Sequence, residues 1–93
     1  MQCTGLFEAG DSLRNFVHDL GLPLFFLIGV RSLRAHRQGG AADTCPVFTE
    51  PILQAWRLPY VLLDPERDDP SALAAAYRQA ADAGRAGAVL LAE

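Results

Sequence analysis

Residues 23–31 read PLFFLIGVR, an apolar run that begins at a proline and ends at an arginine. From Leu24 to Val30 apolar and polar residues do not alternate, which is typical of a strand covered on both faces in a parallel sheet. The shortness of the run and the flanking Pro23 and Gly29 favour a strand over a buried helix. It is also too short to span a bilayer, so the sequence predicts no membrane partner.

A helix is predicted just before this strand. Asp11 or Ser12 would accept hydrogen bonds from the free N–H groups of its first turn. Gly21, which can adopt the left-handed conformation, would end it before Pro23. Its buried face would carry four apolar residues at helical spacing, Leu13, Phe16, Val17 and Leu20.

Helices and strands continue to alternate after Arg31. A polar loop is expected over residues 32–44. The expected elements after it are a helix from Thr44 or Thr49 to Trp56, a strand over Tyr60–Leu63, a helix from Asp69-Pro70 to Gly84 and a strand over Ala88–Leu91. The buried stripe of the last helix would be Leu73, Ala76, Tyr77, Ala80 and Ala81.

This order predicts a single α/β domain over residues 1–93, a three-layer architecture with a parallel sheet flanked by helices. Residues 1–4 would supply the stump of one more strand. About three strands leave an open apolar edge, and such an edge tends to pair with another chain. We therefore expect the polypeptide to be stable mainly with a partner.

Composition narrows the class of protein further. The net charge is −3, which gives no general reason to expect nucleic-acid binding. The two cysteines, Cys3 and Cys45, lack the spacing of a metal site and are interpreted as free thiols in a reducing cytoplasm. A cytoplasmic location is therefore expected.

Two segments carry a resemblance to a known family: Met1-Gln2-Cys3-Thr4-Gly5-Leu6 and Leu27-Ile28-Gly29-Val30-Arg31. The chain resembles part of the pyrimidine-binding domain of thiamine-diphosphate-dependent decarboxylases, most closely the phosphonopyruvate and sulfopyruvate decarboxylases. In that family a strand ends in a Met-Gln-Asn-Ser-Gly-Leu-Gly-Asn-like turn, and a helix and a second strand follow. Phe7 and Glu8 depart from the glycine and asparagine that are usual there.

The resemblance implies a set of site residues. Thr4, Gly5 and Leu6 would lie in a turn near the aminopyrimidine of thiamine diphosphate, where glycine lets a flat ring approach the backbone. Arg31 would emerge at the carboxyl edge of the sheet and bind the carboxylate, phosphonate or sulfonate of a 2-oxo acid. The alternatives are a simple turn between a strand and a helix for the first three residues, and a solvated loop for Arg31.

The resemblance also implies partners. The family's catalytic glutamate lies upstream of the turn, so a second chain would supply it, and no catalytic residue is assigned to this chain. A pyrophosphate-type domain, often on another chain, would hold the diphosphate through Mg²⁺. The basic residues around Arg31 suit an acidic acyl carrier protein as well as a small anionic substrate.

Three functions follow from this reading. The chain would be a split subunit of a thiamine-diphosphate-dependent 2-oxo acid decarboxylase. Alternatively, it would be a non-catalytic interaction subunit of the same fold, or a small stand-alone α/β binding domain whose resemblance is accidental. Met1 would also be consistent with an internal position in a longer reading frame.

Overall fold

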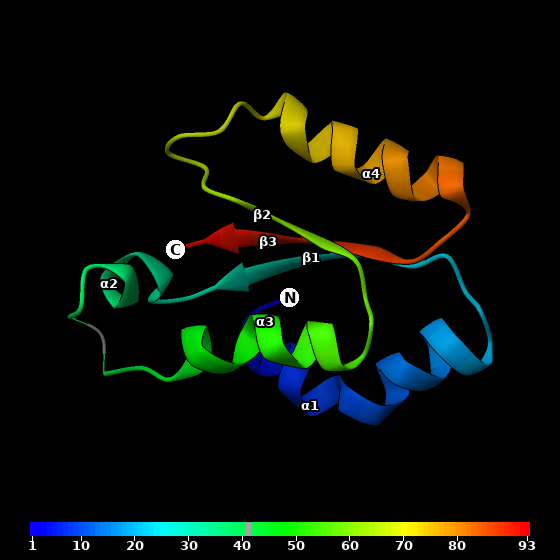
Figure 1. Ribbon diagram of the computed structural model, residues 1–93, viewed down its shortest axis with the longest axis horizontal. Helices are drawn as coiled ribbons and strands as arrows, with labels where there is room; N and C mark the ends of the chain where they lie inside the picture. The colour runs from blue at the N-terminus through cyan, green and yellow to red at the C-terminus, as the bar shows by residue number, and fades with distance from the viewer. Residues whose placement is uncertain (41) are drawn as a thin grey trace.

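The computed structural model describes residues 1–40 and 42–93. A parallel sheet of three strands, in the order β1-β3-β2, forms the middle layer. Helix α4 covers one face of this sheet, and α1 and α3 cover the other (Figure 1). The α/β class with a parallel sheet flanked by helices is therefore confirmed.

The strands are short and lie close to the segments predicted for them. They are β1 (Phe25–Val30), β2 (Tyr60–Leu63) and β3 (Gly87–Ala92). The helical elements are α1 (Cys3–Arg14), the single π-helical turn η1 (Asn15–Asp19), α2 (Leu33–Arg37), α3 (Cys45–Ala55) and α4 (Ser71–Ala83). None of the helices described is both long enough and apolar enough to cross a bilayer.

The core lies between the sheet and the layer of α1 and α3. Alternate residues of the strands point into it, because successive side chains of a strand face opposite sides. The buried strand residues on this face are Phe26, Ile28, Val30, Ala88, Leu90 and Ala92. The opposite side of the core is formed by Leu6 and Leu13 from α1 and by Leu53 from α3.

The first two residues extend the sheet beside β1. Gln2 forms a parallel bridge with Gly29, and the Gly29 N–H donates to the Met1 carbonyl at 2.8 Å. The predicted strand stump is thus present, reduced to this bridge. Helix α1 starts at the next residue, Cys3, so the expected turn over Thr4, Gly5 and Leu6 is the first turn of a helix instead.

The predicted start of the first helix was wrong. Residues 11 and 12 lie inside α1, whose backbone leaves the helical region at Gly10 (φ 19°, ψ −97°) next to the Trp56 ring. The Asp11 carboxylate binds Arg14 instead of capping the helix. The wider turn η1 then rotates side chains away from the 3.6-residue period, so Phe16 and Leu20 are exposed.

The loop after β1 contains a helix that the sequence did not indicate. Leu33 is buried and anchors α2, whose exposed residues are otherwise polar or small. Residue 41 of this loop lies outside the described residues. Helix α3 begins at Cys45 and accommodates both prolines, Pro46 in its first turn and Pro51 inside it.

The layer formed by α4 covers its sheet face incompletely. Every residue of α4 is half-buried or exposed, and Tyr77 from its predicted buried stripe is 55% exposed. On the strand beneath, Leu27 is 44% exposed, so the prediction that β1 is covered on both faces was wrong. One helix is too narrow to cover three strands. Gly84 does end α4 in the left-handed conformation, as predicted (φ 63°).

Candidate functional site at the carboxyl edge of the sheet

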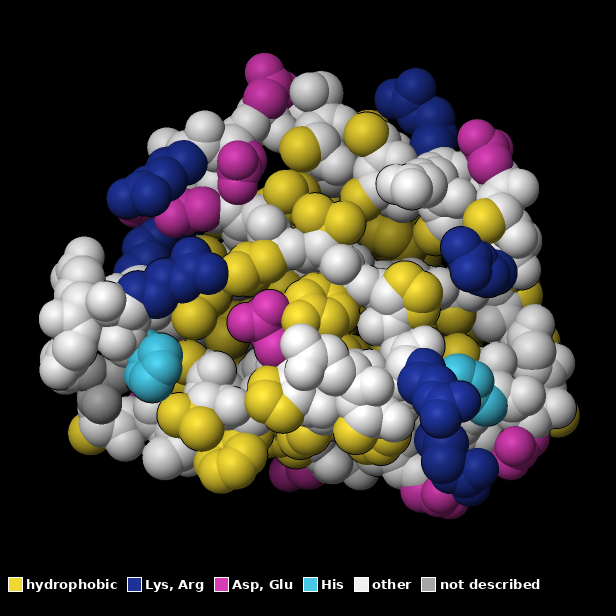
Figure 2. All heavy atoms as spheres, viewed as in Figure 1, with side chains coloured by type: hydrophobic (Ala, Val, Ile, Leu, Met, Phe, Trp, Pro, Cys, Tyr) yellow, Lys and Arg dark blue, Asp and Glu magenta, His cyan; other side chains and the backbone are white. Residues whose placement is uncertain are grey.

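Charged side chains gather at the edge where the three parallel strands end. In open parallel sheets this edge is where ligands bind. Arg31 follows β1, Asp64 follows β2 and Glu93 follows β3. In Figure 2 basic and acidic side chains lie together at the left of the molecule, near α2 and the loop after β2.

Arg31 is held at this edge by an ion pair. Its Nε donates to Asp43 Oδ2 at 2.7 Å, and Ser32 Oγ donates to the same oxygen at 3.2 Å. The other carboxylate oxygen accepts from the Cys45 backbone N–H at 2.9 Å. This N–H and the Arg31 guanidinium lower the pKa of Asp43 to about 2. The carboxylate therefore stays ionised and fixes the chain that follows β1.

Ser32 has a left-handed backbone conformation, with φ 62° and ψ 10°. A residue other than glycine adopts this conformation only at a cost of about 1 kcal/mol, which the surrounding structure must offset. The hydrogen bond to Asp43 and the burial of Leu33 supply that support. The turn lies between Arg31, which is bound to Asp43, and Leu33, which is buried in the core.

Arg34 lies shortly after β1 and contacts the residues that follow the ends of β2 and β3. Its guanidinium binds Asp64 at 2.9 Å and Glu66 at 3.5 Å, and its backbone N–H donates to the Glu93 carbonyl at 2.9 Å. The guanidinium and the Glu66 backbone N–H hold the pKa of Asp64 below its usual value. Among the described residues, the buried Nε of Arg34 has no hydrogen-bond partner. Arg34, which the sequence reading grouped with the basic residues around Arg31, is therefore mainly a structural contact between the strand ends.

The side chains of Glu93 and Gln2 form a hydrogen bond next to Gly29, which has no side chain of its own. Gln2 Nε2 donates to Glu93 Oε1 at 3.1 Å. A Cβ on Gly29 would lie 2.6 Å from Glu93 Oε1 and 2.7 Å from Gln2 Nε2. A side chain at this position would therefore have to displace the ends of two flexible polar side chains, those of Glu93 and Gln2.

The structure brings the two predicted parts of the site to the same edge. The pairing of Gln2 with Gly29 puts the first turn of α1 beside the end of β1, where Arg31 begins. Thr4 and Gly5 are half-buried, whereas the side chain of Leu6 is fully buried in the core. The Leu6 backbone N–H donates to the Gln2 carbonyl at 3.2 Å, so this residue presents no exposed group to a ligand in this fold.

Thiamine diphosphate fits this edge only in part. A Cβ on Gly5 would point toward the Cβ of Met1, 3.5 Å away, so the bare side of Gly5 faces this chain's own first residue. Thr4 retains a hydroxyl at the half-buried first turn. Within the described residues, no three His, Cys, Asp or Glu side chains lie close enough to hold a metal ion. The described residues therefore provide only part of a site for this cofactor.

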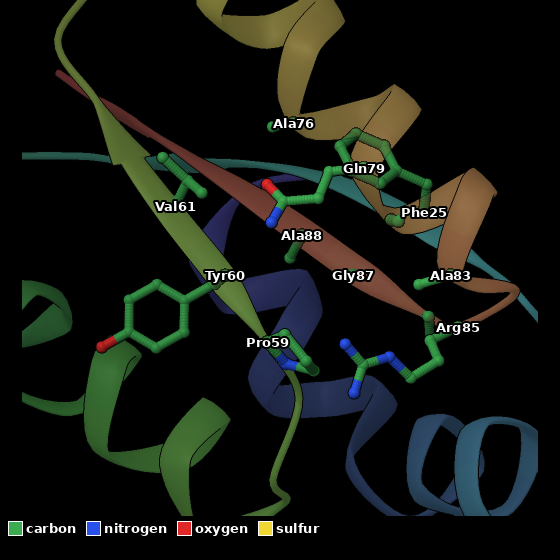
Figure 3. A pocket seen from close by; sticks show the side chains of 12 residues that line it. Phe25, Pro59, Tyr60, Val61, Ala76, Gln79, Ala83, Arg85, Gly87 and Ala88 are labelled. Carbon is green, nitrogen blue, oxygen red and sulfur yellow. The ribbon is translucent and has the colours of Figure 1, made fainter.

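A hollow at the opposite, amino edge of the sheet has no counterpart in the sequence patterns. It has a volume of about 200 Å³ and lies between β2 and α4 (Figure 3). Five alanines are among the residues that line it, together with the polar side chains of Tyr60, Gln79 and Arg85. It arises where α4 passes over the edge of the sheet, a packing relation that no local motif encodes.

A second, apolar groove lies on the other side of α4. It has a volume of about 390 Å³. The residues that line it are Phe25, Leu27, Pro70, Leu73, Ala74 and Tyr77. We call it the α4–β1 groove.

No protein-family model, curated protein or solved structure matches this chain significantly.

Proposed function

We propose that this chain is a split subunit of a thiamine-diphosphate-dependent 2-oxo acid decarboxylase of the phosphonopyruvate or sulfopyruvate decarboxylase type. One observation carries the proposal: the parallel pairing of Gln2 with Gly29 brings the first turn of α1 and Arg31 to one carboxyl edge. The order of a paired strand residue, a helix and an apolar strand also agrees with the order expected from the resemblance.

Arg31 is the proposed contact for an anionic substrate. Its side chain is half exposed, and in the bonds of the described residues it uses only Nε, toward Asp43. The ion pair therefore orients the guanidinium while its two terminal nitrogens remain for a carboxylate, phosphonate or sulfonate. Such oxyanions accept paired hydrogen bonds from arginine, which makes the contact directional.

The residues that bind the cofactor would come from this chain and from partner chains. Thr4, through its hydroxyl, and Gly5, through its backbone, would line one side of the aminopyrimidine, and the buried Leu6 would hold this turn on the core. Thiamine diphosphate itself supplies the carbanion chemistry for loss of carbon dioxide. The catalytic glutamate and the groups that hold Mg²⁺ and the diphosphate would come from partner chains.

The incompletely covered surfaces support an assembly. Val61 on the edge strand β2 is 42% exposed, and Leu27 and Tyr77 expose apolar area at the α4–β1 groove. A small domain that leaves this much apolar side chain in water gains stability when another chain covers it.

The test compares the chain alone with the chain co-expressed with the products of neighbouring genes. Calorimetric titration with thiamine diphosphate and Mg²⁺ should show no binding to the chain alone and binding to the purified complex. In that complex, Arg31→Gln should raise the KM for the 2-oxo acid at least tenfold and leave cofactor affinity unchanged. Arg37→Gln, an exposed arginine on nearby α2, is the matched control and should change neither value. A complex that assembles but binds no cofactor refutes the proposal.

A non-catalytic interaction subunit of the same fold is the second candidate. It is favoured by the burial of the Leu6 side chain and by the contact of Gly5 with Met1, which leave little surface for a cofactor. In this case Gly5→Ala and Arg31→Gln would leave the turnover of the assembled complex unchanged. A loss of turnover in a complex of normal stoichiometry would exclude this role.

A further inference from the structure

The two edge strands of the sheet differ in whether their outward backbone groups are bonded. Strand β3 lies in the middle, so β1 and β2 are the edges. At the β1 edge, the Met1 ammonium donates to the Leu27 carbonyl at 2.7 Å, and the Gly29 N–H donates to the Met1 carbonyl at 2.8 Å. The first residues of the chain therefore cover the outer side of β1.

Strand β2 has no such cover. The Ala88 N–H of β3 donates to the Pro59 carbonyl, so residues 59, 61 and 63 direct their backbone groups toward β3. Tyr60 and Leu62 alternate with them and direct their N–H and carbonyl groups away from the sheet. Within residues 1–40 and 42–93, no hydrogen bond joins these outward groups to another residue. The outer side of β2 is therefore an open pairing edge.

The side chains of β2 do not protect this edge. Tyr60–Leu63 contains no charged residue and no proline, the two kinds of residue that usually prevent an edge strand from pairing. Val61 is 42% exposed and lines the hollow between β2 and α4 (Figure 3). Figure 2 shows hydrophobic side chains in the hollowed middle of the face that β2 crosses in Figure 1, between α4 and α3.

Charges of opposite sign lie at the two ends of β2. Arg57 precedes the strand, and Arg85 lies beside Pro59 at the same end (Figure 3). Both arginines are exposed, and neither forms an ion pair with another described residue. Residues 64–69, which follow the strand, carry four carboxylates and one arginine. A strand that pairs antiparallel with a copy of itself therefore places its basic start beside the acidic end of the other.

We propose that β2 is a self-association edge, at which two copies of this chain pair their β2 strands antiparallel across a two-fold axis and form one continuous sheet. In the register that places Val61 opposite Val61 of the partner subunit, Tyr60 lies opposite Leu62 of the partner subunit. These two residues exchange both of their N–H···O hydrogen bonds, so the open groups of both strands are satisfied.

A second copy suits this edge because the edge is complementary to itself. A two-fold interface uses the same surface on both subunits, and here that surface supplies the donors, the acceptors and both signs of charge. At the axis two valines meet on the face of α4, where the neighbouring helix residues Ala76 and Ala80 are small. The inference does not depend on the proposed decarboxylase function, because Arg31 and the first turn of α1 lie at β1 and stay uncovered.

Sedimentation equilibrium of the intact, purified chain tests the association. The mass should approach twice 10.1 kDa at high protein concentration and fall toward 10.1 kDa on dilution. Val61→Lys should weaken the association by at least about tenfold, because two like charges would face each other at the axis. Leu27→Lys is the matched control, since Leu27 is 44% exposed on the covered β1 edge, and it should leave the association unchanged.

A cysteine at residue 61 locates the contact. Opposite residues of a non-hydrogen-bonded antiparallel pair have Cα atoms about 4.5 Å apart, which is within the range of a disulfide. Oxidation of Val61→Cys by dissolved oxygen with a copper catalyst should link two copies through residue 61, as seen by peptide mapping. Leu27→Cys should form no such link under the same conditions.

Sodium chloride separates the antiparallel arrangement from a parallel one. Added salt should weaken the antiparallel dimer, because it screens attraction between opposite charges. A dimer that salt strengthens would have like ends together and would overturn the proposal. A chain that sediments as a monomer at every concentration, or a dimer that Val61→Lys leaves intact, would overturn it too. The mass of the unsubstituted chain and its salt dependence decide the matter even if a variant does not fold.

Discussion

Replacing Leu6 distinguishes a structural role of this residue from a role in ligand binding. Its side chain is 0% exposed and belongs to the core between α1 and the sheet. Leu6→Ala should therefore lower the free energy of unfolding by about 3 to 4 kcal/mol, the usual cost of removing a buried leucine side chain and leaving a cavity. A domain of 93 residues is stable by about 5 to 14 kcal/mol, so the loss is a large share of the total.

The assay is urea unfolding followed by circular dichroism at a fixed temperature. Leu27→Ala is the matched control, because it removes the same atoms from a residue of the sheet that is 44% exposed. It should cost less than about 1 kcal/mol. Equal losses in the two variants, with unchanged slopes of free energy against urea, would refute the assignment of Leu6 to the core. Such a result would favour a first helical turn open to ligands.

Three further predictions concern the carboxyl edge. The pKa of Asp43 is lowered to about 2, so its contribution to stability is present above pH 4 and is lost as the pH falls toward 2. Asp43→Asn should flatten this part of the acid unfolding curve, measured as urea midpoints at several pH values. The pKa of Cys45 is raised to about 11, so its contribution is present below pH 9 and is lost as the pH rises through 11. Thermal unfolding of Cys45→Ala should lack that alkaline decline, and an unchanged decline would contradict the assignment. Gly29→Ala should cost about 1 kcal/mol, because the new Cβ displaces Glu93 and Gln2. In a double-mutant cycle Glu93→Ala should relieve much of this cost, whereas simple additivity would speak against the contact.

Local sequence patterns were sufficient for the strands and for the glycine-ended helix. The predicted strand over Tyr60–Leu63 agrees with β2 at both ends, and the run after Pro23 agrees with β1 to within one residue. Continuous apolar runs bounded by proline or glycine restrict the backbone strongly within a few residues. The left-handed conformation of Gly84 was predictable for the same reason.

The helix starts depended on contacts that are remote in the sequence. Helix α1 begins at Cys3 because Gln2 is held on the sheet by Gly29, not because of a capping side chain. The break at Gly10 lies against Trp56, which arrives from the end of α3. A reading of neighbouring residues alone therefore put the start of the helix at the break.

The sequence by itself determined the alternation of helices and parallel strands and the position of Arg31 after an apolar strand, because both depend on short-range apolar patterns. The tertiary structure decided which side chains meet: Arg31 with Asp43, Arg34 with Asp64, and Gln2 with Glu93. It also decided which face of the sheet stays open, since a single helix spans less width than three strands. Such pairings arise only when distant segments are packed on the same sheet, so local patterns do not encode them.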